Sequence, residues 1–149
     1  MTGVQTCALP IWLDARRQVV ALFREALGRL GAVAAADLPA RRPGPVRIGG
    51  LVVTRQHPMT ARGTVFLAVE DETGMVNVTL WPDTWARLRG VVRRNALLLI
   101  DGDLQLEGQV VNVIARTVVP LTDAVAGAGG PEAPQGVRQQ GYAGMRRQW

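Results

Sequence analysis

The sequence contains no lysine, one histidine and one cysteine, and each scarcity excludes a class of chemistry. Without lysine the chain lacks the phosphate-binding loop of NTPases, a Schiff-base nucleophile and a pyridoxal site. His57 and Cys7 are too few for a zinc centre or a disulfide framework. The composition therefore predicts a cytoplasmic protein with no metal, no cofactor and no catalytic residues of its own.

Long hydrophobic runs are absent as well. The run ALLLI covers only residues 96–100, far fewer than the roughly 20 residues of a membrane span, so no contact with a membrane is expected. The chain has 149 residues, which is enough for one ordinary domain with extensions and too few for a multidomain enzyme.

Positive charge is plentiful but unevenly spread. All 17 basic residues are arginines, and the net charge is +5. Residues 46–118 contain eight arginines against seven acids, whereas residues 12–45 contain six against three. Because the central segment is nearly neutral, only the placement of its arginines can argue for nucleic acid binding.

The two ends of the chain lack the patterns of a folded core. Residues 1–11, MTGVQTCALPI, resemble the translation of a short-read sequencing adapter, which implies that they are not native and that the native protein continues upstream. Residues 119–149 are rich in Gly, Ala, Pro and Gln, and we expect a low-complexity, disordered tail there.

A helical connector is predicted before the central domain, over residues 12–45. Apolar residues recur every three or four positions from 12 to 30, which is typical of one amphipathic helix. A second short helix is expected at 32–38. The Pro/Gly/Arg segment 39–45 is expected to be a linker, because neither a helix nor a sheet interior would accept it.

From Val46 the apolar period changes to two, which predicts strands at 46–56, 64–71, 75–81, 96–105 and 109–117. Gly49 and Gly50 suggest a bulge or a sharp coil in the first strand. Pro82 begins a helix over 82–92 between the third and fourth strands. The fold class is therefore mainly β, a five-stranded Greek-key OB barrel over residues 46–118.

Strand alternation separates a core face from a candidate binding face. Val65, Leu67, Val69, Val76, Val78 and Leu80 are predicted to point into the barrel. Phe66, Asn77, Thr79 and Trp81 are predicted to point outward. An exposed aromatic on this strand pair is a platform for base stacking, which we favour for Phe66 over the alternative that it covers an interface to a neighbouring domain.

Charged residues supply further candidates. Arg55, His57 and Arg62 lie in or beside the first loop, where arginines can bind phosphate, and a solvated loop is the alternative. The triplet Glu70-Asp71-Glu72 enters a hairpin turn and is expected to be solvated, with no role in metal binding. The arginines at 87, 89, 93 and 94 are expected to form a solvated helix face or a phosphate track, and Trp85 is expected in the core.

These residues together resemble a known family. The stretch from VRIGG to WARLR (46–89), followed by ALLLIDGDLQLEGQVVNVIA (96–115), is similar to the C-terminal OB region of bacterial C-family DNA polymerases (the DNA polymerase III alpha-subunit type), especially the error-prone branch. The resemblance implies lesion-tolerant synthesis in the damage response, with the rest of the polymerase chain, accessory proteins and the sliding clamp as partners. The catalytic domains of such polymerases are missing here.

Three functional hypotheses remain open. The leading one is a single-stranded DNA-binding OB domain of an error-prone polymerase. The second is a protein-interaction module that docks an accessory factor or the polymerase body, which the nearly neutral charge favours. The third is a tRNA-binding or single-strand-binding OB protein. The strand-turn-strand around Phe66 is also similar to anticodon-binding OB domains, in which the equivalent aromatic stacks on a base.

Overall fold

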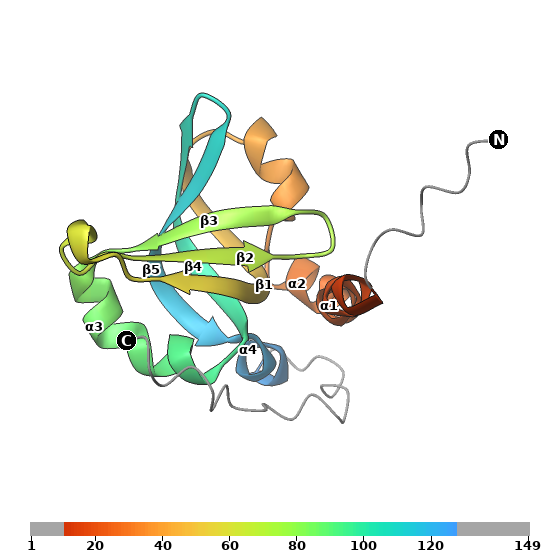
Figure 1. Ribbon diagram of the computed structural model, residues 1–149. Coiled ribbons are helices and arrows are strands. Elements are labelled where there is room, and N and C mark those ends of the chain that lie inside the picture. The colour runs from red at the N-terminus through yellow and green to blue at the C-terminus, as the bar shows by residue number, and fades with distance from the viewer. Residues whose placement is uncertain (1–10, 128–149) are drawn as a thin grey trace.

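The computed structural model describes residues 11–127, in which five strands close into a barrel (Figure 1). The strands are β1 (Gly44–Gln56), β2 (Val65–Glu70), β3 (Met75–Leu80), β4 (Leu97–Glu107) and β5 (Val110–Pro120). Their order around the barrel is β1-β2-β3-β5-β4, with β3 and β5 parallel and the other neighbours antiparallel. The predicted five-stranded OB barrel is confirmed.

Short helices surround the barrel. They are α1 (Ile11–Leu22), α2 (Arg24–Arg29), α3 (Pro82–Arg94) and α4 (Leu121–Gly127), with 3-10 turns η2 (Ala35–Ala40) and η3 (Met59–Ala61). Pro82 occupies the first turn of α3, where its fixed φ suits a helix and its missing N–H costs nothing. Within residues 11–127 no helix is both long and apolar enough to cross a bilayer.

The connector differs in detail from its prediction. The single helix expected over 12–30 is broken at Phe23, whose amide bonds to the carbonyl of Val20, one residue closer than in an α-helix. The expected second helix is the 3-10 turn η2, which includes Pro39. The linker is shorter than expected, because β1 already begins at Gly44 and Pro45 lies where β1 pairs with β4 alone.

Two glycines let the strands of the barrel approach closely. A Cβ on Gly50 would lie 2.6 Å from the carbonyl oxygen of Glu70, and one on Gly102 would lie 2.2 Å from that of Ile114. The register irregularity of β1 falls between Val52 and Thr54 and not at the glycine pair, where we expected a bulge. Glycine at position 50 therefore serves close packing rather than a bulge.

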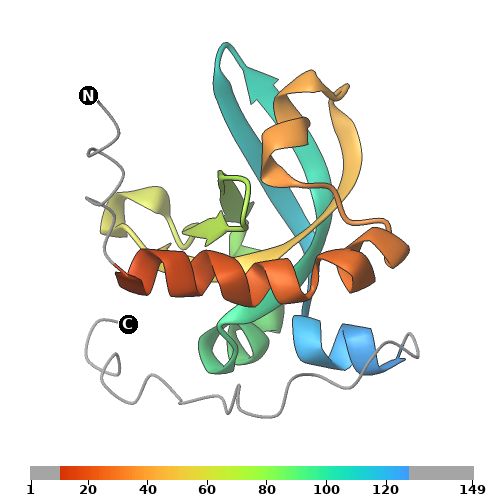
Figure 2. The same cartoon turned by 90° about the vertical axis from the view of Figure 1, so that its right-hand side faces the viewer.

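The structure has two hydrophobic clusters. The first fills the barrel and contains all six residues of β2 and β3 predicted to point inward, together with Trp85. The second joins the connector to the outside of β4 and includes Leu27, Leu97 and Leu99. Figure 2 shows α1 and α2 crossing the barrel, with α4 below them.

Helix α4 corrects the predicted boundary of the tail. Residues 119–127 are ordered, because β5 continues to Pro120 and α4 buries Leu121 and Val125 in the second cluster. These two residues are four apart and therefore share one helix face. The rest of the predicted tail, 128–149, and residues 1–10 of the predicted adapter segment lie outside the described residues.

Candidate functional site

The outer face of β2, β3 and β5 brings the Phe66 ring of β2 together with polar side chains of β3 and β5. Phe66 lies opposite Thr79, and Ala68 lies opposite Asn77, in the antiparallel pair of β2 and β3. In the parallel pair of β3 and β5, Asn77 lies opposite Asn112. Phe66, Asn77 and Thr79, three of the predicted site residues, therefore share one surface.

This surface forms the wall of a groove with a volume of about 590 Å³. The groove runs between the outer face of the barrel and the hairpin that joins β4 to β5. Its lining residues are Pro43, Phe66, Asn77, Thr79, Gln105, Leu106, Glu107, Val110 and Asn112.

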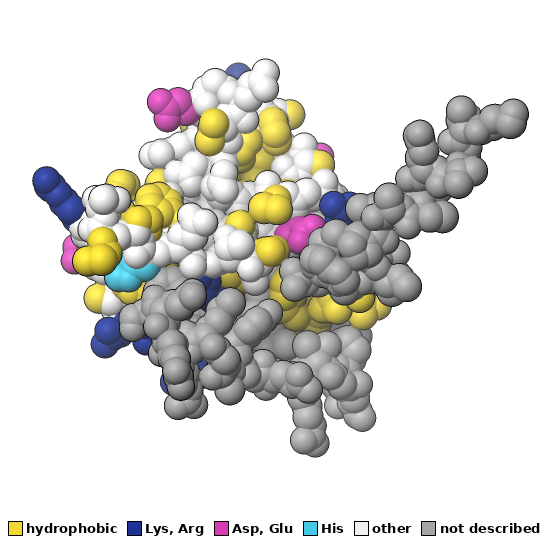
Figure 3. All heavy atoms as spheres, viewed as in Figure 1, with side chains coloured by type: hydrophobic (Ala, Val, Ile, Leu, Met, Phe, Trp, Pro, Cys, Tyr) yellow, Lys and Arg dark blue, Asp and Glu magenta, His cyan; other side chains and the backbone are white. Residues whose placement is uncertain are grey.

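The groove is polar but carries little charge. Asn77, Gln105 and Asn112 contribute amides, and Glu107 is the single charged residue in the lining. Phe66 is 39% exposed, so part of its ring remains available to a ligand. Figure 3, which faces β2 and β3, shows mainly hydrophobic and uncharged side chains there, with arginines toward the edges. Such a surface offers stacking and amide hydrogen bonds rather than phosphate binding.

Thr79 orients a groove residue that the sequence analysis did not identify. Its side chain is only 5% exposed, and its hydroxyl donates a 3.0 Å hydrogen bond to Oδ1 of Asn112. With Oδ1 occupied, the amide group of Asn112 can present its N–H donors to a ligand. Thr79 is therefore a positioning residue. Asn112 was identifiable as an outward residue beside buried Val113, but its place beside Asn77 depends on the pairing of β5 with β3.

Arg55 lies elsewhere and has a structural partner. Its guanidinium donates to the carbonyl of Val92, at 3.2 and 3.0 Å, and to that of Asn95 at 3.1 Å. The last carbonyls of a helix have no partner within the helix, so Arg55 satisfies those at the end of α3. The structural role of Arg55 is this cap, and its contact with phosphate stays a prediction.

The other three predicted site residues lie outside the groove lining. The His57 ring lies 6.3 Å from that of Trp85, at a tilt of 52°. Arg62 is exposed and has a left-handed backbone, with φ of 50°. Trp81 is 53% exposed at the residue that precedes α3. The structure thus assembles three of the seven predicted residues and leaves Arg55, His57, Arg62 and Trp81 around the first loop and α3.

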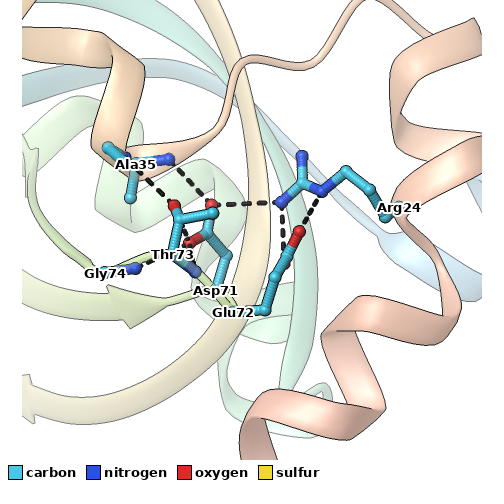
Figure 4. Close-up of polar contacts among 7 residues, drawn as sticks. Arg24, Ala35, Asp71, Glu72, Thr73 and Gly74 are labelled. Carbon is cyan, nitrogen blue, oxygen red and sulfur yellow. Dashed lines mark hydrogen bonds and ion pairs between the residues drawn. The ribbon is translucent and has the colours of Figure 1, made fainter.

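Two residues of the acidic triplet are buried, contrary to the expected solvation. Glu70 and Asp71 are 6% and 4% exposed. One oxygen of Asp71 accepts hydrogen bonds from the backbone of Thr73 and Gly74 and from the Thr73 hydroxyl, and the other accepts from the amide of Ala35 at 2.8 Å (Figure 4). Asp71 therefore closes the turn between β2 and β3 and ties it to η2.

Arginines of the connector complete this cluster. Arg24 pairs with Asp71 at 3.2 Å and with Glu72, and Arg17 pairs with Glu70 at 3.3 Å. The hydrogen bond to Glu72 raises the pKa of the Arg24 guanidinium, which keeps it charged. These contacts explain the burial of the acids and fix α1 and α2 against the barrel. We call Arg17, Arg24, Glu70, Asp71 and Glu72 the connector clamp.

Within residues 11–127, no group of three or more His, Cys, Asp and Glu side chains is arranged to hold a metal ion. The acids of the connector clamp are engaged with arginines and backbone amides. They are consequently structural groups.

A protein-family model matches residues 46–121, and its description is "OB-fold nucleic acid binding domain". The match begins at the residue where the apolar period changes to two. It includes every strand of the barrel except the first two residues of β1, together with α3.

Curated error-prone DNA polymerases are similar in sequence. That of Anaeromyxobacter sp. (strain K) is 44% identical over 116 residues, which is 76% of this chain and 10% of the polymerase. That of Ruegeria pomeroyi is 45% identical over 86 residues, covering 58% of this chain and 8% of the polymerase. The chain thus spans about a tenth of the length of these relatives.

Solved structures share the fold at low sequence identity. The OBody AM1L10 bound to hen egg-white lysozyme is 17% identical, with a TM-score of 0.51, over 61% of this chain and 91% of that one. Aspartyl tRNA synthetase from Entamoeba histolytica is 13% identical, with a TM-score of 0.50, over 60% of this chain and 21% of that one.

Proposed function

Because the chain belongs to the family of OB-fold nucleic acid binding domains, we propose that it binds single-stranded DNA in the groove of β2, β3 and β5. We place this activity in an error-prone DNA polymerase, where the domain holds the template strand away from the catalytic centre. The 44% sequence identity to the Anaeromyxobacter polymerase supports that context.

The half-exposed ring of Phe66 in the groove lining is the observation that carries the proposal. Any base offers a π-face to an aromatic ring, so a stacking contact tolerates every sequence. The amides of Asn77, Gln105 and Asn112 lie within the same groove and can bond to the edges of a stacked base. A single strand exposes both the faces and the edges of its bases, whereas a duplex does not.

The charge of the groove sets the expected strength of binding. Its single charged lining residue, Glu107, repels phosphate, so stacking and amide contacts must supply most of the affinity. We expect weak binding with little sequence preference and a shallow dependence on salt, since few counterions are released.

Phe66→Ala in the full 149-residue chain tests the proposal. Fluorescence anisotropy with a labelled oligo-dT should show a loss of about 1–3 kcal/mol of binding free energy, the usual worth of one stacked base. Met75→Ala is the matched control, because Met75 is an exposed residue of the same outer face and lies outside the groove lining. Equal affinities of the two variants for oligo-dT would refute the assigned site.

Protein docking is a second candidate, favoured by exposed apolar residues beside the first loop. Met59 is 99% exposed and Trp81 is 53% exposed. An accessory protein, the sliding clamp or the polymerase body would be the partner. Failure of the full chain to bind oligo-dT even at about 50 mM salt would favour this function. Preference for a single-stranded RNA over oligo-dT would instead favour the RNA-binding alternative.

A further inference from the structure

Helix α3 carries a concentration of positive charge that the groove does not use. Four arginines and one aspartate, Asp83, give its 13 residues a net charge of +3. The arginines are all exposed, at positions 87, 89, 93 and 94. Figure 1 shows α3 at the end of the barrel, next to the loop between β1 and β2.

The arginines flank the outward face of α3. Trp85 and Val92 are buried against the barrel, and successive residues turn by 100° about a helix axis. By that rotation Asp83, Ala86 and Gly90 form a strip on the side opposite the barrel. The two flanks of the strip are Arg87 with Arg94, and Arg89 with Arg93. A Cβ on Gly90 would lie 3.2 Å from Nη2 of Arg94, so this guanidinium extends over the strip.

Three of these arginines, Arg87, Arg89 and Arg94, lack the acidic partners that five other arginines of the described chain have. Ion pairs to carboxylates are made by Arg17, Arg24, Arg29, Arg47 and Arg116. Arg87, Arg89 and Arg94 make none with any carboxylate of residues 11–127. Arg87 instead donates to the carbonyl of Arg116 at 2.8 Å. The helix therefore presents positive charge that the described fold does not neutralise.

Helix stabilisation explains only part of this charge. Arg93 and Arg94 lie in the last turn, where positive charge interacts favourably with the helix dipole, and Arg93 also lies 5.8 Å from the centre of the Trp85 ring. Arg87 and Arg89 lie nearer the middle of the helix, where the dipole contributes little. A ligand with several negative charges accounts for all four arginines.

We propose that the outward face of α3 is a second nucleic-acid site, which binds the phosphate backbone of duplex DNA. Its one aromatic residue, Trp85, is buried, so this convex face cannot stack on bases. Guanidinium groups pair with phosphate oxygens without reading sequence. A duplex is the phosphate ligand with the highest charge density, about one charge per 1.7 Å of axis, and suits a rigid convex surface best.

The two sites lie at successive places along the chain. Strand β3 leads from Thr79 in the groove to Trp81, the residue before α3. The first loop also packs beside the start of α3, since a Cβ on Gly63 would lie 3.4 Å from Pro82. A junction between single- and double-stranded DNA can therefore engage the groove and α3 together.

The experiment compares two variants that each remove two positive charges from the full chain. Arg89→Gln with Arg94→Gln alters the α3 face. Arg29→Gln with Arg41→Gln alters exposed arginines of the connector that lie outside the connector clamp, and is the matched control. Anisotropy is measured with a blunt duplex, oligo-dT, a duplex with a single-stranded overhang and a poly-glutamate peptide, each over a range of salt. Thermal midpoints verify that both variants are folded.

The α3 variant should lose duplex affinity, and its plot of log affinity against log salt should become shallower by about two, one for each lost phosphate contact. Its affinity for oligo-dT should be unchanged, and the overhang probe should bind wild type more tightly than either simpler DNA. If both variants lost the same duplex affinity, the loss would depend on the net charge of the chain and not on the α3 face, and the proposed site would be overturned. Binding of poly-glutamate as tight as that of duplex would overturn the choice of ligand. Phe66→Ala tests the groove separately, through oligo-dT.

Discussion

A single hydroxyl group, that of Thr79, determines how Asn112 faces the groove. We expect Thr79→Val to cost about 0.5–1.5 kcal/mol of binding free energy for oligo-dT, the net value of one hydrogen bond, because the Asn112 amide loses its fixed orientation. Titration by anisotropy measures the loss. Thr79→Ser keeps the hydroxyl and should retain wild-type affinity, so an equal loss in both variants would contradict a positioning role.

At the scale of the residue, the sequence predicts side-chain positions best where strand alternation is strict. It placed Leu67 in the core and Phe66 on the surface, because strand neighbours point to opposite faces. It did not reveal the contacts of Arg55 with the carbonyl of Val92 or of Asp71 with the amide of Ala35, because these partners are more than 30 residues away. A side chain's charge is visible in the sequence, but the group that it meets depends on how the elements pack.

At the scale of elements, Asp71 makes the contact between the β2–β3 turn and η2 depend on pH. Burial raises the pKa of Asp71, but hydrogen bonds from Thr73, Ala35 and Gly74 outweigh it and hold that pKa below its ordinary value. The resulting stability is present above the unfolded pKa, about 3.9, and is lost as pH falls through the folded pKa.

We therefore expect Asp71→Asn to be less stable than wild type near neutral pH and the difference to shrink below about pH 4. Urea unfolding at a series of pH values measures it. Asp37→Asn, at an exposed acid of η2, is the control and should show no such convergence. A constant difference between wild type and Asp71→Asn across the series would contradict this origin of the stability.

The elements themselves were predicted unevenly for a physical reason. Strands and α3 have apolar residues at a regular spacing, and the sequence located each within about three residues. No apolar period can be recognised in segments as short as the break at Phe23, the turn η2 and helix α4. Their positions follow from burial against β4 and from Asp71, which are contacts between distant segments.

At the scale of the whole molecule, the barrel is closed and every strand has two neighbours. A cavity in its core should therefore weaken the entire barrel and not one edge. We expect Leu67→Ala, which truncates a side chain with 2% exposure, to lower the free energy of unfolding by roughly 2–5 kcal/mol. Phe66→Ala should lower it by much less. Urea denaturation compares the two variants. A larger loss of unfolding free energy for Phe66→Ala would mean that the inward and outward positions of β2 are assigned one residue out of register.

The clamp and the second cluster also define which stretch of chain can be expressed alone. The family match begins at residue 46, yet a fragment cut there would uncover Leu97 and Leu99 and leave Asp71 without Arg24. Such a fragment would expose an apolar surface beside unpaired acidic side chains and be prone to self-association. The smallest soluble expression fragment consistent with these contacts retains α1 and α2 and extends through α4, so its boundaries are those of the packed structure rather than of the recognised motif.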